Sequence, residues 1–162
     1  MRRKRVTAYL VLAAVSGLLL VACQRSYALW VVPGSTARNL VFGFSDSRDS
    51  EVKVRPNQIS VFPCASIKRN SDGSSYPRQE ESVWWGAASS DDLPPPTNRL
   101  IYGEGLRNWR PPQPLATPGC YVVLAYAEAE NTTVAATLGF NIDGDGKVME
   151  MSRSQYESVF NQ

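Results

Sequence analysis

Three cysteines are the residues of this chain with the most defined covalent chemistry, and no histidine is present to activate them. A chain of 162 residues without histidine excludes Ser-His triads, imidazole acid–base catalysis and nearly all zinc chemistry. Without an imidazole base, nucleophilic catalysis is the least favoured role for any of the three thiols. We therefore expect a protein that is not an enzyme and has no cofactor, with cysteines that are modified or paired.

The first cysteine, Cys23, follows a segment with the composition of a secretory leader. Four basic residues at positions 2–5 precede an apolar stretch at 6–22, and the small residue Ala22 comes directly before the cysteine. This stretch is short for a helix that must cross about 30 Å of hydrocarbon. Residues 1–22 are therefore predicted to be a signal peptide. The alternative is an uncleaved membrane anchor in which the cysteine is incidental.

The sequence Leu20-Val21-Ala22-Cys23 resembles the lipobox of bacterial lipoproteins. In that family a diacylglyceryl group is attached to the cysteine thiol, a dedicated peptidase cuts before the cysteine, and the new amino terminus is acylated. The resemblance implies that Cys23 is lipidated and that several acyl chains anchor the protein stably in a membrane. Gln24 stands where an Asp tends to retain such proteins at the inner membrane. The expected location is therefore the outer membrane, facing the periplasm.

Removal of the leader reverses the sign of the net charge. The whole chain has 17 Lys and Arg against 15 Asp and Glu, but without the four basic residues of the leader 13 remain against 15. Nucleic-acid binding needs a concentrated basic patch, and a slightly acidic mature chain gives no reason to expect one. We expect no nucleic-acid partner.

With Cys23 assigned to lipid, Cys64 and Cys120 are left as an even pair in an oxidising compartment. Cys64 ends an apolar run that starts at Ile59, and Cys120 begins another that extends to Tyr126. Both cysteines therefore belong to strand-like segments, and a disulfide between two strands or two sheets is expected. Two buried free thiols are the alternative.

An oxygen-rich segment at 141–146 has the beginning of a calcium-binding pattern. Asn141, Asp143 and Asp145 have the spacing of the first three ligands of an EF-hand loop, with glycine at the sixth position. The twelfth position is Ser152, where the loop needs a bidentate Glu, and no preceding helix is expected. A glycine-rich hairpin turn is the favoured interpretation, and a weak calcium site is the alternative.

The aromatic residues are the most suggestive group for binding. Trp84 and Trp85 are adjacent, so in a strand one must face the core and the other must face outward. Trp109 lies between Arg107 and Arg110, and an exposed indole beside guanidinium groups can stack on a sugar ring, a peptide or a protein. The alternative is that Trp109 folds back over the end of the domain. The expected partner-binding face consists of Tyr102, Arg107, Trp109 and Arg110.

Short strands are the elements that must position these residues. Apolar segments alternate with turns rich in Pro, Gly and Asp, and no sustained helical periodicity is present. Residues 65–81 are expected to be an exposed loop and 104–119 a proline-rich excursion. A short helix is possible at 152–160, where Ser154 and Glu157 have the spacing of a capping box. Strands are expected at 27–32, 40–44, 51–55, 58–64, 82–86, 99–103, 120–127, 133–142 and 147–151.

This spacing of short strands predicts an all-β fold. The expected architecture is an antiparallel β-sandwich with a fibronectin type III or immunoglobulin-like topology, and a small β-barrel is the alternative. The predicted divisions are a signal peptide at 1–22, a lipidated cysteine and tether at 23–36, the sandwich at 37–151, and a tail or short helix at 152–162.

A second resemblance rests on a set of short segments. A pattern in small proteobacterial lipoproteins of unknown function is loosely similar to Arg99–Gly103, Trp109-Arg110, Pro111-Pro112, Pro114-Leu115 and Pro118–Val123. The resemblance implies the same envelope location and a sandwich-like domain, and it implies no activity. The sequence therefore predicts a lipid-anchored, non-enzymatic envelope protein that binds a protein or glycan partner. A cell-wall hydrolase or a hydrolase inhibitor is the alternative.

We expect the protein isolated from membranes to begin at an acylated Cys23. Mass spectrometry of the intact protein and of its amino-terminal peptide measures both the cleavage and the added acyl mass. An intact leader without modification would contradict the assignment.

Overall fold

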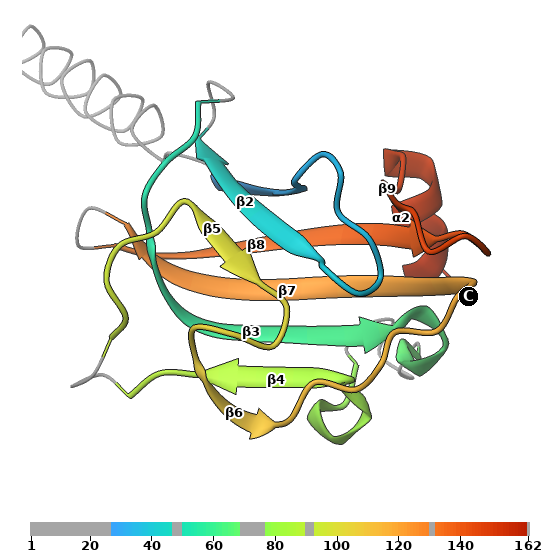
Figure 1. Cartoon of the computed structure of the whole chain (residues 1–162), viewed down its shortest axis with the longest axis horizontal. Coiled ribbons are helices and arrows are strands. Elements are labelled where there is room, and N and C mark those ends of the chain that lie inside the picture. Colours follow the sequence, from blue (N-terminus) through green and yellow to red (C-terminus); the bar gives the residue numbers. More distant parts are fainter. Residues whose placement is uncertain (1–26, 47–49, 69–76, 90–92, 130–131, 162) are drawn as a thin grey trace, which may run out of the picture.

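Two antiparallel sheets pack face to face and form an all-β sandwich (Figure 1), which confirms the predicted fold class. The structure, a computed structural model, describes residues 27–46, 50–68, 77–89, 93–129 and 132–161. The leader and Cys23 lie outside the described residues. None of the helices in the described ranges is long and apolar enough to cross a bilayer.

The smaller sheet has three strands in the order β1-β2-β5, and the larger sheet has six in the order β6-β4-β3-β7-β8-β9. The strands of the smaller sheet are β1 (Tyr27–Val31), β2 (Val41–Asp46) and β5 (Arg99–Ile101). Those of the larger sheet are β6 (Arg107–Arg110), β4 (Trp84–Ala87), β3 (Arg55–Pro63), β7 (Gly119–Ala129), β8 (Thr132–Ile142) and β9 (Val148–Glu150). This strand order is that of a fibronectin type III sandwich: β1-β2-β5 corresponds to strands A-B-E, and β4-β3-β7-β8 corresponds to strands C′-C-F-G. The strands β6 and β9 are additional and lie at the two edges of the larger sheet.

The core lies between the two sheets because alternate residues of each strand face inward. On β7, Val123, Ala125 and Ala127 are buried, and Phe42 of β2 is also fully buried. The Phe42 ring meets the ring of Phe140 on β8 edge to face, with centroids 5.8 Å apart. Burying one such side chain stabilises the fold by about 1.5–3 kcal/mol. Apolar packing across the two sheets therefore holds the sandwich together.

Tyr121, near the start of β7, fixes the point at which the chain enters the larger sheet. Its hydroxyl accepts a hydrogen bond from the backbone N–H of Ala116 at 2.6 Å. A tyrosine at this position with a bond to the backbone a few residues earlier is the tyrosine corner of immunoglobulin-like sandwiches. Gly119 makes the tight return possible, since a Cβ there would lie 2.5 Å from the carbonyl oxygen of Ala116.

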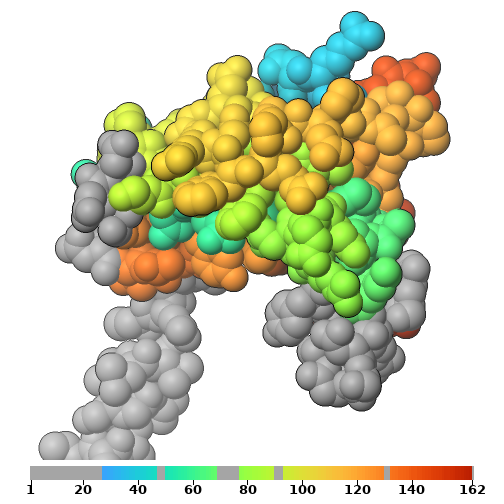
Figure 2. Space-filling view, turned by 90° about the horizontal axis from the view of Figure 1, so that it is seen from below, coloured from blue at the N-terminus to red at the C-terminus, as the bar shows by residue number. Residues whose placement is uncertain are grey.

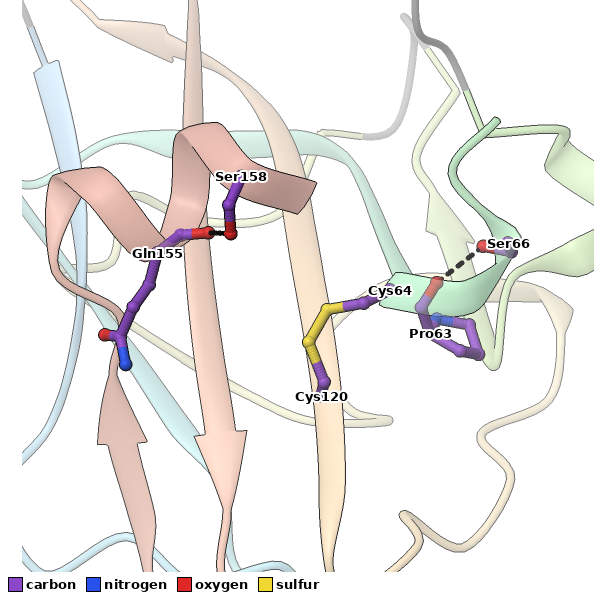
Figure 3. The surroundings of a disulfide bond; sticks show 6 residues. All are labelled: Pro63, Cys64, Ser66, Cys120, Gln155 and Ser158. Carbon is purple, nitrogen blue, oxygen red and sulfur yellow. Dashed lines mark hydrogen bonds between the residues drawn. A yellow bond between two sulfur atoms is a disulfide. The ribbon is translucent and has the colours of Figure 1, made fainter. Parts of the chain in front are cut away.

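The predicted disulfide between Cys64 and Cys120 is present, with Cα atoms 5.4 Å apart. Cys64 begins the 3-10 turn η1 (Cys64–Ser66) directly after β3, and Cys120 lies on the neighbouring strand β7, so the bridge joins the turn at the end of β3 to β7. The helix α2 (Arg153–Phe160) lies beside the bridge (Figure 3). Val159 of α2 packs with Ile67, directly after η1, and with Val122 of β7 in a second apolar cluster, against which both cysteines lie.

The predicted boundary between tether and sandwich at residue 37 is wrong. β1 begins at Tyr27, pairs with β2 along its length and lies against β8 of the other sheet. Thr36 and Ala37 also bond to the turn before β9. Residues 27–36 therefore belong to the folded domain, because Leu29, which is more buried than Ala28 and Trp30 on either side of it, places an apolar side chain in the core.

The carboxyl-terminal helix is present, but the predicted capping box is wrong by two residues. Ser152 is the N-cap: its side chain accepts a bond from the backbone N–H of Gln155, and the Gln155 side chain accepts one from the N–H of Ser152. This reciprocal pair satisfies two backbone donors at the start of the helix. Ser154 and Glu157 instead lie inside the helix.

One predicted strand is not formed, and one strand that is formed is not predicted. The expected strand at 51–55 is reduced to isolated bridges at Glu51 and Val54, and regular pairing begins only with β3. In contrast, the segment 104–119, which we expected to be irregular, contains β6. The sequence Arg-Asn-Trp-Arg has no apolar alternation, so only its pairing with β4 makes it a strand.

Removal of the disulfide is expected to lower the free energy of unfolding by a large part of its value in a small domain. Replacement of both Cys64 and Cys120 by Ala opens a loop with a sequence separation of 56, so the free energy of unfolding should fall by about 4 kcal/mol. Urea titration of the variant and the wild type measures the difference. A single Cys64→Ala change should cost as much as the double change. An unfolding midpoint of the wild type that does not respond to a reducing agent would contradict the bridge.

Candidate functional site

The two adjacent tryptophans of β4 lie on opposite faces of the larger sheet. Trp84 is fully buried between the sheets, whereas Trp85 lies on the outer face, opposite Ser60 of β3 and Arg110 of β6. Among the described residues the indole nitrogen of Trp85 has no hydrogen-bond partner, although it is buried. The outer face at β4 and β6 is therefore built around an aromatic side chain that the core does not use.

A β-bulge in β6 directs Trp109 to the same outer face. The register pairs Gly86 with Asn108 and Trp85 with Arg110, which leaves Trp109 as the extra residue of the bulge. Asn108 points inward, where its Oδ1 accepts a hydrogen bond of 2.7 Å from the Trp84 indole. The bulge thus places two consecutive side chains, those of Trp109 and Arg110, beside Trp85.

The side chains on this face are held against one another. The rings of Trp85 and Trp109 stack with centroids 5.9 Å apart and planes 27° from parallel, and Trp109 is still 58% exposed. The guanidinium carbon of Arg107 lies 5.0 Å from the Trp109 ring centroid. Within the described ranges neither Arg107 nor Arg110 forms an ion pair. We call these four residues, Trp85, Arg107, Trp109 and Arg110, the tryptophan–arginine face.

A groove of about 410 Å³ borders this face. The register of the sheet places Tyr126, Gln58, Ala87 and Arg107 in one row across β7, β3, β4 and β6. Since Ala87 lies in the groove and opposite Arg107, the groove leads into the tryptophan–arginine face. We call it the outer-face groove; its lining residues are Asn57, Gln58, Ala87, Ala88, Leu93, Tyr126, Glu128 and Thr133.

Tyr102, which the sequence grouped with these residues, lies on the other side of the larger sheet. Its ring meets that of Trp84 at 5.1 Å, and its hydroxyl donates to the carbonyl oxygen of Gln113 at 2.9 Å. Burial, with a smaller effect from Tyr121, raises the pKa of this hydroxyl. Tyr102 therefore stays protonated and holds the proline-rich segment against the core. The structure brings Arg107, Trp109 and Arg110 together and separates Tyr102 from them.

A larger cleft of about 870 Å³ lies between the loop at 36–38, the segment at 112–117 and the turn at 144–146. Its charged lining residues are Arg38 and Asp145, and most of the rest belong to turns and prolines. The outer-face groove is smaller, but it adjoins the face that carries the exposed indole and the guanidinium groups of Arg107 and Arg110. We therefore place the candidate site there and not in the larger cleft.

The segment considered for calcium is a hairpin turn. The Oδ1 atom of Asp143 accepts hydrogen bonds from the backbone N–H groups of Asp145 at 3.0 Å and Lys147 at 2.9 Å. Asn141 is part of β8, opposite Cys120, and Gly146 has the positive φ that the turn needs. No group of three or more His, Cys, Asp and Glu in the described part of the chain could hold a metal ion. The geometry favours the turn.

A scan against protein-family models, a search of curated proteins and a search of solved structures find no match to this chain. The chemistry of the site is therefore the guide to function. Guanidinium groups bind carboxylates and phosphates, often through two hydrogen bonds, and exposed indoles supply rigid contact area. The amides of Asn57 and Gln58 each offer a donor and an acceptor. This combination suits the recognition of a ligand better than the breaking of bonds.

The turn interpretation predicts that calcium does not stabilise the protein. Because a ligand that binds only the folded state raises the melting temperature, excess calcium should leave it unchanged. Asp143→Ala should lower the free energy of unfolding by about 1–3 kcal/mol because it removes two hydrogen bonds to a turn. Asp145→Ala is the control, since its carboxylate accepts no hydrogen bond from the described residues. Thermal melts with and without calcium measure both effects, and a rise with calcium would restore the metal site.

Proposed function

We propose that this chain is a lipid-anchored, non-enzymatic protein of the bacterial cell envelope that binds a protein or glycan partner through the tryptophan–arginine face. The observation that carries the proposal is the environment of the Trp109 side chain. It is 58% exposed to solvent, and it also packs against Trp85 and Arg107. Tryptophan and arginine are the residues most enriched at the centres of binding interfaces.

The packing of the face supports binding because it lowers the entropy that a partner must offset. Ordering a flexible side chain on binding costs about 0.5–1.5 kcal/mol. The Trp109 ring is already stacked, and the hydrogen bond from Trp84 to Asn108 fixes the strand that carries it. A partner would therefore meet side chains that are held in place before it arrives.

The edge of the sheet itself is poorly suited to pairing with a partner strand. β6 has four residues, contains a bulge and carries two arginines, and Pro111 and Pro112 follow it directly. Short, bulged and charged edges with proline are the features by which proteins block strand addition. Figure 2 shows the yellow to gold segment that includes β6 spread over the surface on this side of the sandwich. Recognition by side chains is therefore the mode that we propose.

The distribution of carboxylates supports a non-enzymatic protein over a cell-wall hydrolase. Hydrolysis of a glycosidic bond generally needs two carboxylates that flank one cleft. Three clefts lined by described residues each contain one acidic side chain, namely Asp145, Glu128 or Glu104. None of these clefts offers the required pair.

Sequence features support the location of the protein. The lipobox resemblance at 20–23 and the basic, apolar leader favour export and lipid anchoring, and Gln24 favours the outer membrane, facing the periplasm. The disulfide of Cys64 and Cys120 is of the kind that forms in oxidising compartments.

Trp109→Ala should remove at least one interaction of the protein in intact envelopes. The side chain is mostly exposed, so we expect the free energy of unfolding to change by about 1 kcal/mol or less while the binding surface loses its central ring. Chemical cross-linking in whole cells, followed by identification of the products, compares wild type and variant. Met149→Ala is the matched control because this exposed apolar residue lies on β9, at the opposite edge of the same sheet. Identical cross-links in all three proteins would end the proposal.

A further inference from the structure

We infer that the outer-face groove and the tryptophan–arginine face form one continuous site for an anionic glycan chain, its charge carried by carboxylates or phosphates. This inference rests on the proposed function and names the class of ligand for the same surface.

The two parts are joined by the register of four strands. Gln58 pairs with both Ala87 and Tyr126, and Ala87 pairs with Arg107, so the groove and the arginine lie in one row. The neighbouring row contains Leu124, Ser60, Trp85 and Arg110. A ligand in the groove can therefore extend across β4 to the guanidinium groups on β6 without leaving the sheet surface.

The side chains along this path match the groups of a sugar chain. The amides of Asn57 and Gln58 make no side-chain hydrogen bond with the described residues, so their donors and acceptors are free for hydroxyl groups. The rings of Tyr126 and Trp109 provide flat apolar surface at the two ends of the path. A neutral apolar ligand would leave the amides and guanidinium groups without partners, which is unfavourable.

The charges are arranged so that an anion is favoured at one end. Arg107 and Arg110 have no ion-pair partner in the described part of the chain, while the protein without its leader is slightly acidic. Glu128, the acidic residue of the groove, lies at the far end on β7, opposite Arg55. The anionic groups of the ligand would therefore lie over β6, where two positive charges are close together.

Two segments cover the outer face toward one end of the strands. Val122 packs under Val159 of α2, and the side chain of Gln79 donates to Ser60 at 2.8 Å. Gln79 begins the short 3-10 turn η2 (Gln79–Glu81), which lies over β3. The row from Tyr126 to Arg107 stays open and runs across the strands, so a linear polymer can follow it from β7 to β6.

The test uses the full chain in a detergent without a sugar headgroup, with intrinsic tryptophan fluorescence and equilibrium dialysis as readouts. The probes are polygalacturonate and phosphomannan, and their neutral controls are methyl-esterified polygalacturonate and dephosphorylated mannan. Polyglutamate supplies negative charge without sugar rings. The variants are Trp109→Ala and the double change Arg107→Gln with Arg110→Gln. Arg38→Gln is the matched control because Arg38 is an exposed arginine in the other cleft.

We expect at least one of the two anionic glycans to bind, more weakly as salt rises, and the neutral forms and polyglutamate to bind at least tenfold more weakly. Whether polygalacturonate or phosphomannan binds identifies the anion. The double arginine change and Trp109→Ala should each weaken binding at least tenfold, and Arg38→Gln should leave it unchanged. Urea midpoints close to that of the wild type exclude misfolding as the cause.

Equal binding of polyglutamate would overturn the inference in favour of an acidic peptide. It would also fall if neither glycan binds, or if the double arginine variant binds as well as the wild type. The proposed function stands in these cases as long as cross-links in the envelope still depend on Trp109. If those cross-links also do not depend on Trp109, the glycan inference and the proposed function are both contradicted.

Discussion

Adjacent residues of a strand face opposite sides of a sheet, and in β4 this constraint acts on two neighbouring tryptophans. Trp84 is directed between the sheets, where it contacts Tyr102 and donates a hydrogen bond to Asn108. Trp85 is directed outward, where it supports Trp109. Because Asn108 and Trp109 are consecutive residues of β6, the bond that ties this strand to the core also sets the position of the exposed indole. Core and surface are thus coupled through one pair of strands.

The sequence was sufficient for the fold class and for most strands, since period-two alternation and turn residues are local signals. It was not sufficient for β6, whose four residues become a strand only through pairing with β4. It also misplaced the start of the domain, because the alternation at 27–31 was assigned to a strand at the end of a tether and not to the sandwich. Local pattern identifies a strand, but only long-range packing shows to which sheet it belongs.

The same limit applies to the candidate site. Arg107, Trp109 and Arg110 could be selected because exposed indoles beside guanidinium groups are chemically distinctive. Tyr102 belongs to the same set of aromatic candidates, but it lies on the core side of the larger sheet. Nothing in the local sequence around Gln58 and Tyr126 indicates a binding role, because their place in the groove depends on the register of β3 with β4 and β7.

The start of β1 at Tyr27 has a consequence for where the protein can act. Three residues separate Tyr27 from Cys23, and an extended chain spans at most about 3.5 Å per residue. An acyl-bearing Cys23 would therefore keep the beginning of β1 within about 14 Å of the lipid headgroups. The linker between the lipid anchor and the sandwich would be very short, so the domain would stay in a layer about one domain thick on the surface of the bilayer. Any molecule that it binds would have to reach the membrane surface first.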